Sequence, residues 1–152
     1  MNVFELLKAD HEKVSGIFDQ LAETTEQASK TRTEKFAQLK QELDIHAHIE
    51  ETIFYPILKR EAETRAITLE GFEEHKVIKT LLGELAAMPV ESEVWTAKFK
   101  VLKESVEHHV DEEEDEMFAS ARQVLTSDQI EEIGTVMEAE KQKQKQQLKA
   151  SA

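Results

Sequence analysis

The sequence predicts an all-α protein: an up-down-up-down four-helix bundle with an additional C-terminal helix. Apolar residues recur at alternating steps of three and four, which is helical rather than strand periodicity. Only four glycines and two prolines interrupt the 152 residues. The chain also reads as two copies of one helical hairpin, as expected when an internal duplication builds a bundle.

The duplication is visible in both helices of the hairpin. In the second helix of each half, five residues match at an offset of 63: Phe36, Leu39, Leu43, His46 and Glu50 against Phe99, Leu102, Val106, His109 and Glu113. In the first helix, the offset is 64: Leu7, His11, Val14, Phe18 and Leu21 against Gly71, His75, Ile78, Leu82 and Leu85. Only the pair Leu7 and Gly71 breaks the match.

The length and the 39% hydrophobic content suffice for one core and therefore one domain. We assign residues 1–125 to the bundle and residues 126–152 to a C-terminal helix and solvated tail of the same domain.

The first hairpin is predicted to contain a helix over about residues 2–22 and a second over about 34–63, joined by the polar segment 23–33. Pro56 lacks an amide hydrogen and clashes with the preceding turn, so we expect a kink or local break near Tyr55.

The second hairpin is predicted to contain helices over about residues 69–88 and 93–125, with Pro89 ending the first and Ser92 as half of a capping box. Thr126 or Ser127 then caps a fifth helix, which we expect to pack across one end of the bundle. Its apolar face is formed by Ile130, Ile133 and Met137. Beyond Glu140 the Lys- and Gln-rich sequence predicts frayed or solvated helix.

Composition excludes several classes of function. The chain has no cysteine, so a metal would bind through nitrogen and oxygen, and a reducing compartment is compatible. No apolar run approaches the roughly 18 residues of a membrane helix, and residues 1–10 do not resemble a signal peptide. We therefore expect a cytoplasmic protein with no membrane association. A net charge of −13 without a basic stripe predicts that nucleic acid is not a partner.

Six duplicated residues form the candidate metal site. Residues four apart share one helix face, so His46 with Glu50, and His109 with Glu113, can reach the same ion or adjacent ions. Both pairs interrupt apolar stripes, and burying carboxylates without compensation costs several kcal/mol each, which calls for a cation. The predicted ligands are His11, His46, Glu50, His75, His109 and Glu113. Six ligands overfill a tetrahedral zinc site and suit two divalent ions better, although ligand type alone admits iron, manganese, zinc or copper.

Other polar residues near this set are assigned lesser roles. His48 and His108 have no counterparts, so we interpret them as surface or outer groups; the pair His48 and Glu51 is the second-ranked alternative register. Except for Glu113, the acidic run of residues 112–116 is interpreted as a solvated face.

Asp10 and Glu74 each precede a predicted ligand. They can accept a proton from an outer ring nitrogen, but a step of about 100° favours water. Tyr55 is expected to pack with its hydroxyl at the edge of the core.

Over residues 1–125 these motifs resemble the hemerythrin-like HHE cation-binding family: Asp10-His11, His46 with Glu50-Glu51 and Tyr55-Pro56, Glu74-His75, and His109 with Glu113-Glu114. The resemblance implies a four-helix bundle around a non-haem centre of two iron ions, oxo- or hydroxo-bridged, with the six residues as ligands. In oxygen-carrying hemerythrins a further histidine follows the third-helix histidine by four residues; here that position is Lys79. The resemblance thus implies a site with one imidazole fewer and more open coordination.

Three functions follow as hypotheses. The first is binding of oxygen, peroxide, nitric oxide or a related small molecule for storage or sensing. The second is an oxidoreductase that consumes peroxide or oxygen, or a protein that handles iron. The third is a metal-free helical interaction module. The sequence leaves open whether the protein is an enzyme, which residues would be catalytic, and whether a protein partner exists.

Overall fold

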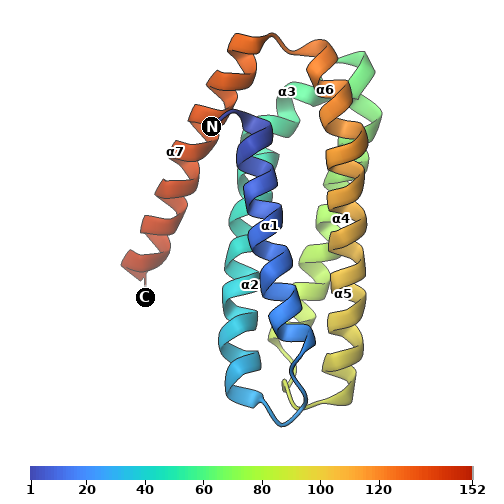
Figure 1. Cartoon of the computed structure of the whole chain (residues 1–152), viewed down its shortest axis with the longest axis vertical. Helices are drawn as coiled ribbons and strands as arrows, with labels where there is room; N and C mark the ends of the chain where they lie inside the picture. The colour runs from blue at the N-terminus through green and yellow to red at the C-terminus, as the bar shows by residue number, and fades with distance from the viewer. Residues whose placement is uncertain (152) are drawn as a thin grey trace.

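The computed structural model describes residues 1–151 and contains four long helices arranged as a bundle (Figure 1). Ala152, the last residue of the predicted C-terminal segment, lies outside the described residues. The bundle helices are α1 (Val3–Ala22), α2 (Ser29–Ile49), α4 (Ala62–Ala86) and α5 (Glu93–Glu112). They run alternately up and down, as the sequence predicts. Residues 1–151 contain no strand.

Two of the long helices continue beyond a π-helical turn. Helix α2 passes through η1 (Glu50–Phe54) into α3 (Tyr55–Lys59), and α5 passes through η2 (Glu113–Met117) into α6 (Phe118–Val124). The break expected at Pro56 is therefore real, but Pro56 is not its sole cause, because η2 has the same turn without a proline. Both π turns begin at the glutamate of a duplicated pair, and such turns are frequent at functional sites.

The helix boundaries in the middle of the chain differ from the prediction. The second helical segment ends at Lys59, and α4 already begins at Ala62 instead of near Leu69. The turn forms at Glu61, which has extended backbone angles, and Thr64 then donates a hydrogen bond to the carbonyl of Leu58. Neither glycine nor proline marks this turn, so the sequence carries no local signal for it.

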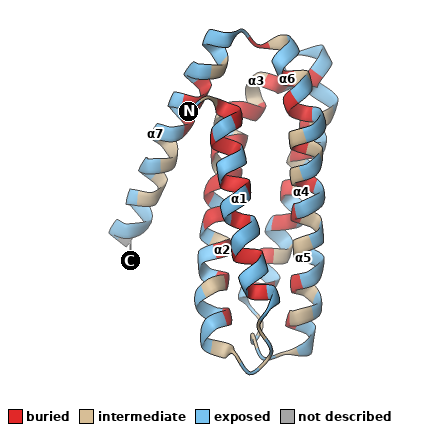
Figure 2. Cartoon of the chain, viewed as in Figure 1, coloured by how far each residue is buried: buried red, intermediate tan, exposed pale blue. Residues whose placement is uncertain are grey.

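The core consists of two apolar clusters. One gathers near the N-terminus of α1, η1, α3, α6 and α7, and the other fills the opposite half of the bundle around Phe18, Phe36, Trp95 and Phe99. Buried residues line the inward faces of the bundle helices (Figure 2). The duplicated histidines and glutamates belong to neither cluster, although all six are buried.

Helix α7 (Ser127–Ser151) packs beside the bundle, not across its end as expected. It contacts α1, α2 and η1, and Figure 1 shows it descending along their outer side. Thr126 and Gln129 cap its start reciprocally. Gly134 meets the N-terminal backbone so closely that an added Cβ would lie 2.4 Å from the Met1 carbonyl oxygen. The last turns before residue 151 are largely exposed, in agreement with the predicted solvated helix.

No helix among residues 1–151 combines the length and the apolar composition needed to cross a bilayer.

Candidate metal centre

The structure brings all six predicted residues together in one layer. His11 Nε2 lies 3.3 Å from His46 Nε2 and 3.1 Å from Glu113 Oε1. Glu50 Oε1 lies 3.3 Å from His46 Nε2 and 3.1 Å from His75 Nε2. His109 Nε2 lies 3.4 Å from Glu113 Oε2. Every imidazole therefore points its Nε2 atom inward, and each glutamate lies between histidines of different helices.

The inward atoms divide into two groups compact enough to hold a cation. His11, His46, Glu50 and Glu113 form the first group, which we call position one. Glu50, His75 and His109 form the second, which we call position two. Within each group the potential ligand atoms lie within 4.8 Å of one another, and Glu50 is shared. The arrangement suits two adjacent ions that have a carboxylate in common.

The two glutamates are unusually poor in hydrogen bonds for buried carboxylates. Both Glu50 oxygens and Glu113 Oε1 are buried without a hydrogen-bond partner, because the nearby imidazoles do not meet hydrogen-bond geometry. The side chains of Glu50 and Glu113 are 0% exposed. A buried ionised group is stable only when it is paired or coordinates a metal. Because no donor of the protein satisfies these oxygens, they are suited to coordinate a cation.

Each histidine is oriented by a second carboxylate on its outer ring nitrogen. His46 Nδ1 donates to Asp10 at 2.9 Å, and His109 Nδ1 donates to Glu74 at 2.7 Å. The prediction that Asp10 and Glu74 face water is therefore wrong. The helical step turns each carboxylate away from the histidine that follows it on its own helix but directs it toward a histidine of the neighbouring helix.

The remaining two histidines are held by Glu114 and Glu51, which are not among the six predicted site residues. His11 Nδ1 donates to Glu114 at 2.6 Å, and His75 Nδ1 donates to Glu51 at 2.8 Å. The prediction that Glu114 belongs to a solvated face is therefore wrong. Both residues follow a predicted ligand directly and match at the offset of 63, so the duplication itself was the available signal.

These outer contacts fix the state of the rings. Because Nδ1 donates to a carboxylate, Nε2 is the nitrogen that would present its lone pair to a bound cation, as in most protein metal sites. Lys79 approaches Glu51 at 3.0 Å, so the residue at the position of the additional hemerythrin histidine supports an outer carboxylate.

Tyr55 lies inside the layer, contrary to the expectation of a hydroxyl at the core edge. It is 0% exposed; its hydroxyl donates a short hydrogen bond to Glu113 and lies 3.4 Å from His109 Nε2. Its ring stacks on His75 at 5.2 Å. Gly71 makes this possible, since a Cβ there would lie 3.0 Å from the Tyr55 ring. The single failure of the repeat, Leu7 against Gly71, was therefore the signal for the buried phenol.

The pKa values reflect this network. Burial alone would lower the pKa of the His109 imidazole, but the adjacent carboxylates of Glu113 and Glu74 raise it to about 10. Burial acts likewise on His46, and Glu50 with Asp10 reverses the shift and raises that pKa well above its usual range. His75 is raised by Glu50 and Glu51 against the opposing effect of burial. Without a cation, protons on these imidazoles compensate the buried carboxylates.

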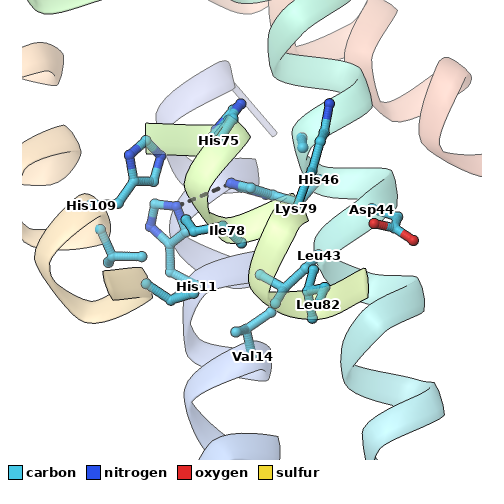
Figure 3. A pocket seen from close by; sticks show the side chains of 13 residues that line it. His11, Val14, Leu43, Asp44, His46, His75, Ile78, Lys79, Leu82 and His109 are labelled. Carbon is cyan, nitrogen blue, oxygen red and sulfur yellow. Dashed lines mark hydrogen bonds between the residues drawn. The ribbon is translucent and has the colours of Figure 1, made fainter. Parts of the chain in front are cut away.

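A small cavity reaches all four imidazoles from the side of the second apolar cluster (Figure 3). The volume of this cavity is about 30 Å³. One water molecule needs about 10–15 Å³ on the same measure, so the cavity has room for a very small molecule. Its other walls are almost entirely apolar: Val14, Leu43, Ala47, Ile78, Leu82, Val106 and Val110, with Asp44 and Lys79 completing the lining. The cavity has the size and polarity for a very small, weakly polar ligand.

The two other histidines lie outside the layer, as expected. His48 pairs with Glu140 of α7 at 2.9 Å, and the His108 side chain is 74% exposed. The alternative register is wrong, because Glu51 contacts His75 and Lys79 instead of His48.

Comparisons with known proteins agree with this architecture. The family model of the hemerythrin HHE cation-binding domain matches residues 2–121. Uncharacterized proteins from Mycobacterium bovis and Mycobacterium tuberculosis are 30% identical over 140 residues, which cover 91% of this chain and 84% of theirs. A protein from Nostoc sp. named DNA nickase is 30% identical over 152 residues, and this chain spans 42% of its length.

A solved structure shares the fold. The crystal structure of a hemerythrin HHE cation-binding domain-containing protein from Mycobacterium kansasii superposes with a TM-score of 0.84 at 28% identity, over 95% of this chain and 87% of that one. Together with the family match, this shows that the chain belongs to the hemerythrin HHE cation-binding domain family.

Proposed function

We propose that the protein binds two iron ions through His11, His46, Glu50, His75, His109 and Glu113, and uses them to bind oxygen, peroxide or nitric oxide. The observation that carries the proposal is the set of buried Glu50 and Glu113 oxygens without hydrogen-bond partners. Position one and position two supply the nitrogen and oxygen donors.

The local charge supports two divalent ions. Six carboxylates surround the centre: Glu50, Glu113, Asp10, Glu51, Glu74 and Glu114. Lys79 and Lys141 offset two of their charges. If the imidazoles are neutral, four negative charges remain, which two divalent cations would balance.

Iron is favoured by the family and is compatible with the donors. Imidazole and carboxylate also accept manganese and zinc, so donor chemistry alone does not select the metal. When bound, iron would supply reversible redox chemistry and open coordination positions for a small ligand. The apolar cavity would admit such a ligand and exclude larger molecules.

The protein's own groups would define how the ligand is held. The outer carboxylates keep each Nε2 directed inward. Burial, together with Glu113 and Glu50, raises the pKa of Tyr55 well above its ordinary value, so the phenol keeps its proton in the metal-free protein. The hydroxyl lies between Glu113 and His109, where it would offer a hydrogen-bond donor to a bound ligand. Storage or sensing is our first candidate, and consumption of peroxide or oxygen at the same site is the alternative.

Anaerobic loading with ferrous iron tests the proposal. We expect two irons per chain, with an optical spectrum that changes on exposure to oxygen, nitric oxide or peroxide. A stable change reversed by removing oxygen supports storage or sensing, whereas repeated turnover of hydrogen peroxide supports the oxidoreductase. His46→Ala should lose iron, and His48→Ala is the matched control, because His48 lies outside the layer. Wild-type protein that holds no stoichiometric metal would favour the metal-free interaction module.

We further propose that nucleic acid is not a partner of this chain. The similarity to the Nostoc DNA nickase covers 42% of that protein, and the net charge of −13 here would repel a phosphate backbone. Nicking of supercoiled plasmid by the iron-loaded protein would contradict this.

A further inference from the structure

A lysine of the C-terminal helix reaches the outer layer of the centre. Lys141 Nζ donates a short hydrogen bond to Asp10 Oδ1, while Asp10 Oδ2 accepts a hydrogen bond from His46 Nδ1 at 2.9 Å. The Asp10 and Lys141 side chains are 5% and 14% exposed. The three side chains form a continuous connection from α7 to position one, with Asp10 and His46 buried and Lys141 largely covered.

This connection exists in only one half of the duplicated structure. Glu74 is the counterpart of Asp10, but it faces His108 and Glu112 instead of a lysine. The difference arises because α7 packs against α1 and α2, the helices that carry Asp10 and His46. Lys141 therefore makes the surroundings of His46 different from those of His109.

We propose that Lys141 is a positioning residue for cation binding at position one, acting through Asp10 on His46. The inference rests on the proposed cation binding and adds that α7 is a functional part of the centre. Lys141 holds Asp10 in the orientation that directs His46 Nε2 toward Glu50.

Charge and geometry both support this role. Asp10 is a buried carboxylate whose two oxygens contact His46 and Lys141. Such a charge is costly unless it keeps a partner, and Lys141 provides it. Loss of a group that orients a ligand histidine typically weakens metal affinity by about 10–100-fold. By reciprocity, a cation at position one must also stabilise the docked state of α7.

Cobalt(II) titration of the metal-free protein under nitrogen tests the proposal, with visible absorption as the readout. Lys141→Met should lose about tenfold or more in affinity for one of the two cobalt ions and keep the other. Lys141→Arg retains the charge and should restore binding. Lys143→Met, an exposed substitution on the same helix, should remain within about twofold of wild type.

A double-mutant cycle separates positioning from a general effect on α7. If Lys141 acts through Asp10, Asp10→Asn should lower the affinity for the same cobalt ion. Adding Lys141→Met to that variant should then cause no further loss of affinity. Hydrogen exchange gives an independent readout: cobalt should slow exchange of α7 amides around residues 137–145 in the wild type and not in Lys141→Met.

The outcomes are distinguishable. Wild-type affinity for both cobalt ions in Lys141→Met, or additive losses in the double mutant, would overturn the role of Lys141 while leaving the proposed function intact. A wild-type protein that binds no cobalt would overturn both.

Discussion

Each inward histidine stands between a central carboxylate and an outer one, so its two ring nitrogens have different tasks. In the metal-free protein both nitrogens of His46, His75 and His109 can be protonated at neutral pH, because each pKa is raised by flanking carboxylates. A cation bound at Nε2 would have to displace the inner proton and would leave the outer one in place. Metal binding and proton release are therefore one equilibrium.

This linkage predicts that uptake of two cations near pH 7 releases about three protons per chain, and that apparent affinity rises with pH. Calorimetric titration in buffers of different ionisation enthalpy measures the proton count. Affinity that is independent of pH between 6 and 8 would show that the imidazoles are already neutral.

The same shifts predict how the stability of the metal-free protein depends on pH. A raised imidazole pKa stabilises the fold fully below the unfolded value, about 6.5, and this stabilisation is lost as the pH rises through the folded value. For His109 the folded value is about 10. The temperature of the unfolding midpoint of the metal-free protein should therefore decrease as the pH is raised from 7 to 10. His109→Gln should flatten part of this dependence, and a change at exposed His108 should not.

Gly71 and Tyr55 form another residue-scale unit. A Cβ on Gly71 would lie 3.0–3.2 Å from Tyr55 ring and hydroxyl atoms, and Tyr55 is fully buried. We predict that Gly71→Ala destabilises the protein by about 1–3 kcal/mol through overpacking. Gly83→Ala is the control, since nothing lies within 4 Å of its added Cβ. It should stabilise by about 0.5–1 kcal/mol because alanine favours helix. Urea unfolding compares the two, and equal effects would show that Tyr55 adjusts freely.

At the scale of elements, the π turns connect the duplication to the site. Each begins at a central glutamate and is followed by an aromatic residue that stacks on a histidine: Tyr55 on His75, and Phe118 on His11 at 6.4 Å. The two elements are thus structurally equivalent but chemically different, because only one carries a hydroxyl. The Tyr55 hydroxyl therefore lies between Glu113 of position one and His109 of position two, and the equivalent Phe118 has no hydroxyl to offer.

Elements that depend on the sequence pattern could be predicted, whereas those that depend on tertiary packing could not. The four bundle helices and the inward histidines follow from periodicity and duplication, which local sequence contains. The predicted orientation of Asp10 and Glu74 toward water is wrong because their histidine partners lie on neighbouring helices. The angular position of a residue on its own helix does not show which residues the neighbouring helix places beside it. The turn at Glu61 and the direction of α7 depend on tertiary packing in the same way.

The docking of α7 yields a prediction at this scale. Its Gly134 touches the N-terminal backbone, and an added Cβ would lie 2.4–2.8 Å from atoms of residues 1–3, which cannot move as a flexible side chain would. Gly134→Ala should therefore displace α7 and accelerate hydrogen exchange along it. Gly16→Ala, where nothing lies within 4 Å, should leave α7 protected. Unchanged protection in Gly134→Ala would mean that the N-terminal segment shifts instead.

At the scale of the whole molecule, the centre joins the two halves of the chain. Glu50 of the first half contacts His75 of the second, and Glu113 of the second contacts His11 of the first. The two apolar clusters also draw residues from both halves. A cation shared by these ligands would therefore stabilise the bundle as a unit, because it binds the folded state and not the separated helices.

Loading with ferrous iron under nitrogen should accordingly raise the unfolding midpoint, by an amount equivalent to about 2.7 kcal/mol for one site at a free metal concentration 100 times its Kd. Glu50→Gln should abolish most of this gain, because Glu50 belongs to both cation positions. Glu63→Gln, at an exposed glutamate of α4, should keep it. Chelation should return the wild type to its metal-free midpoint. If iron raised the midpoint of Glu50→Gln as much as that of the wild type, the stabilising ion would have to bind elsewhere than in the layer between the two clusters.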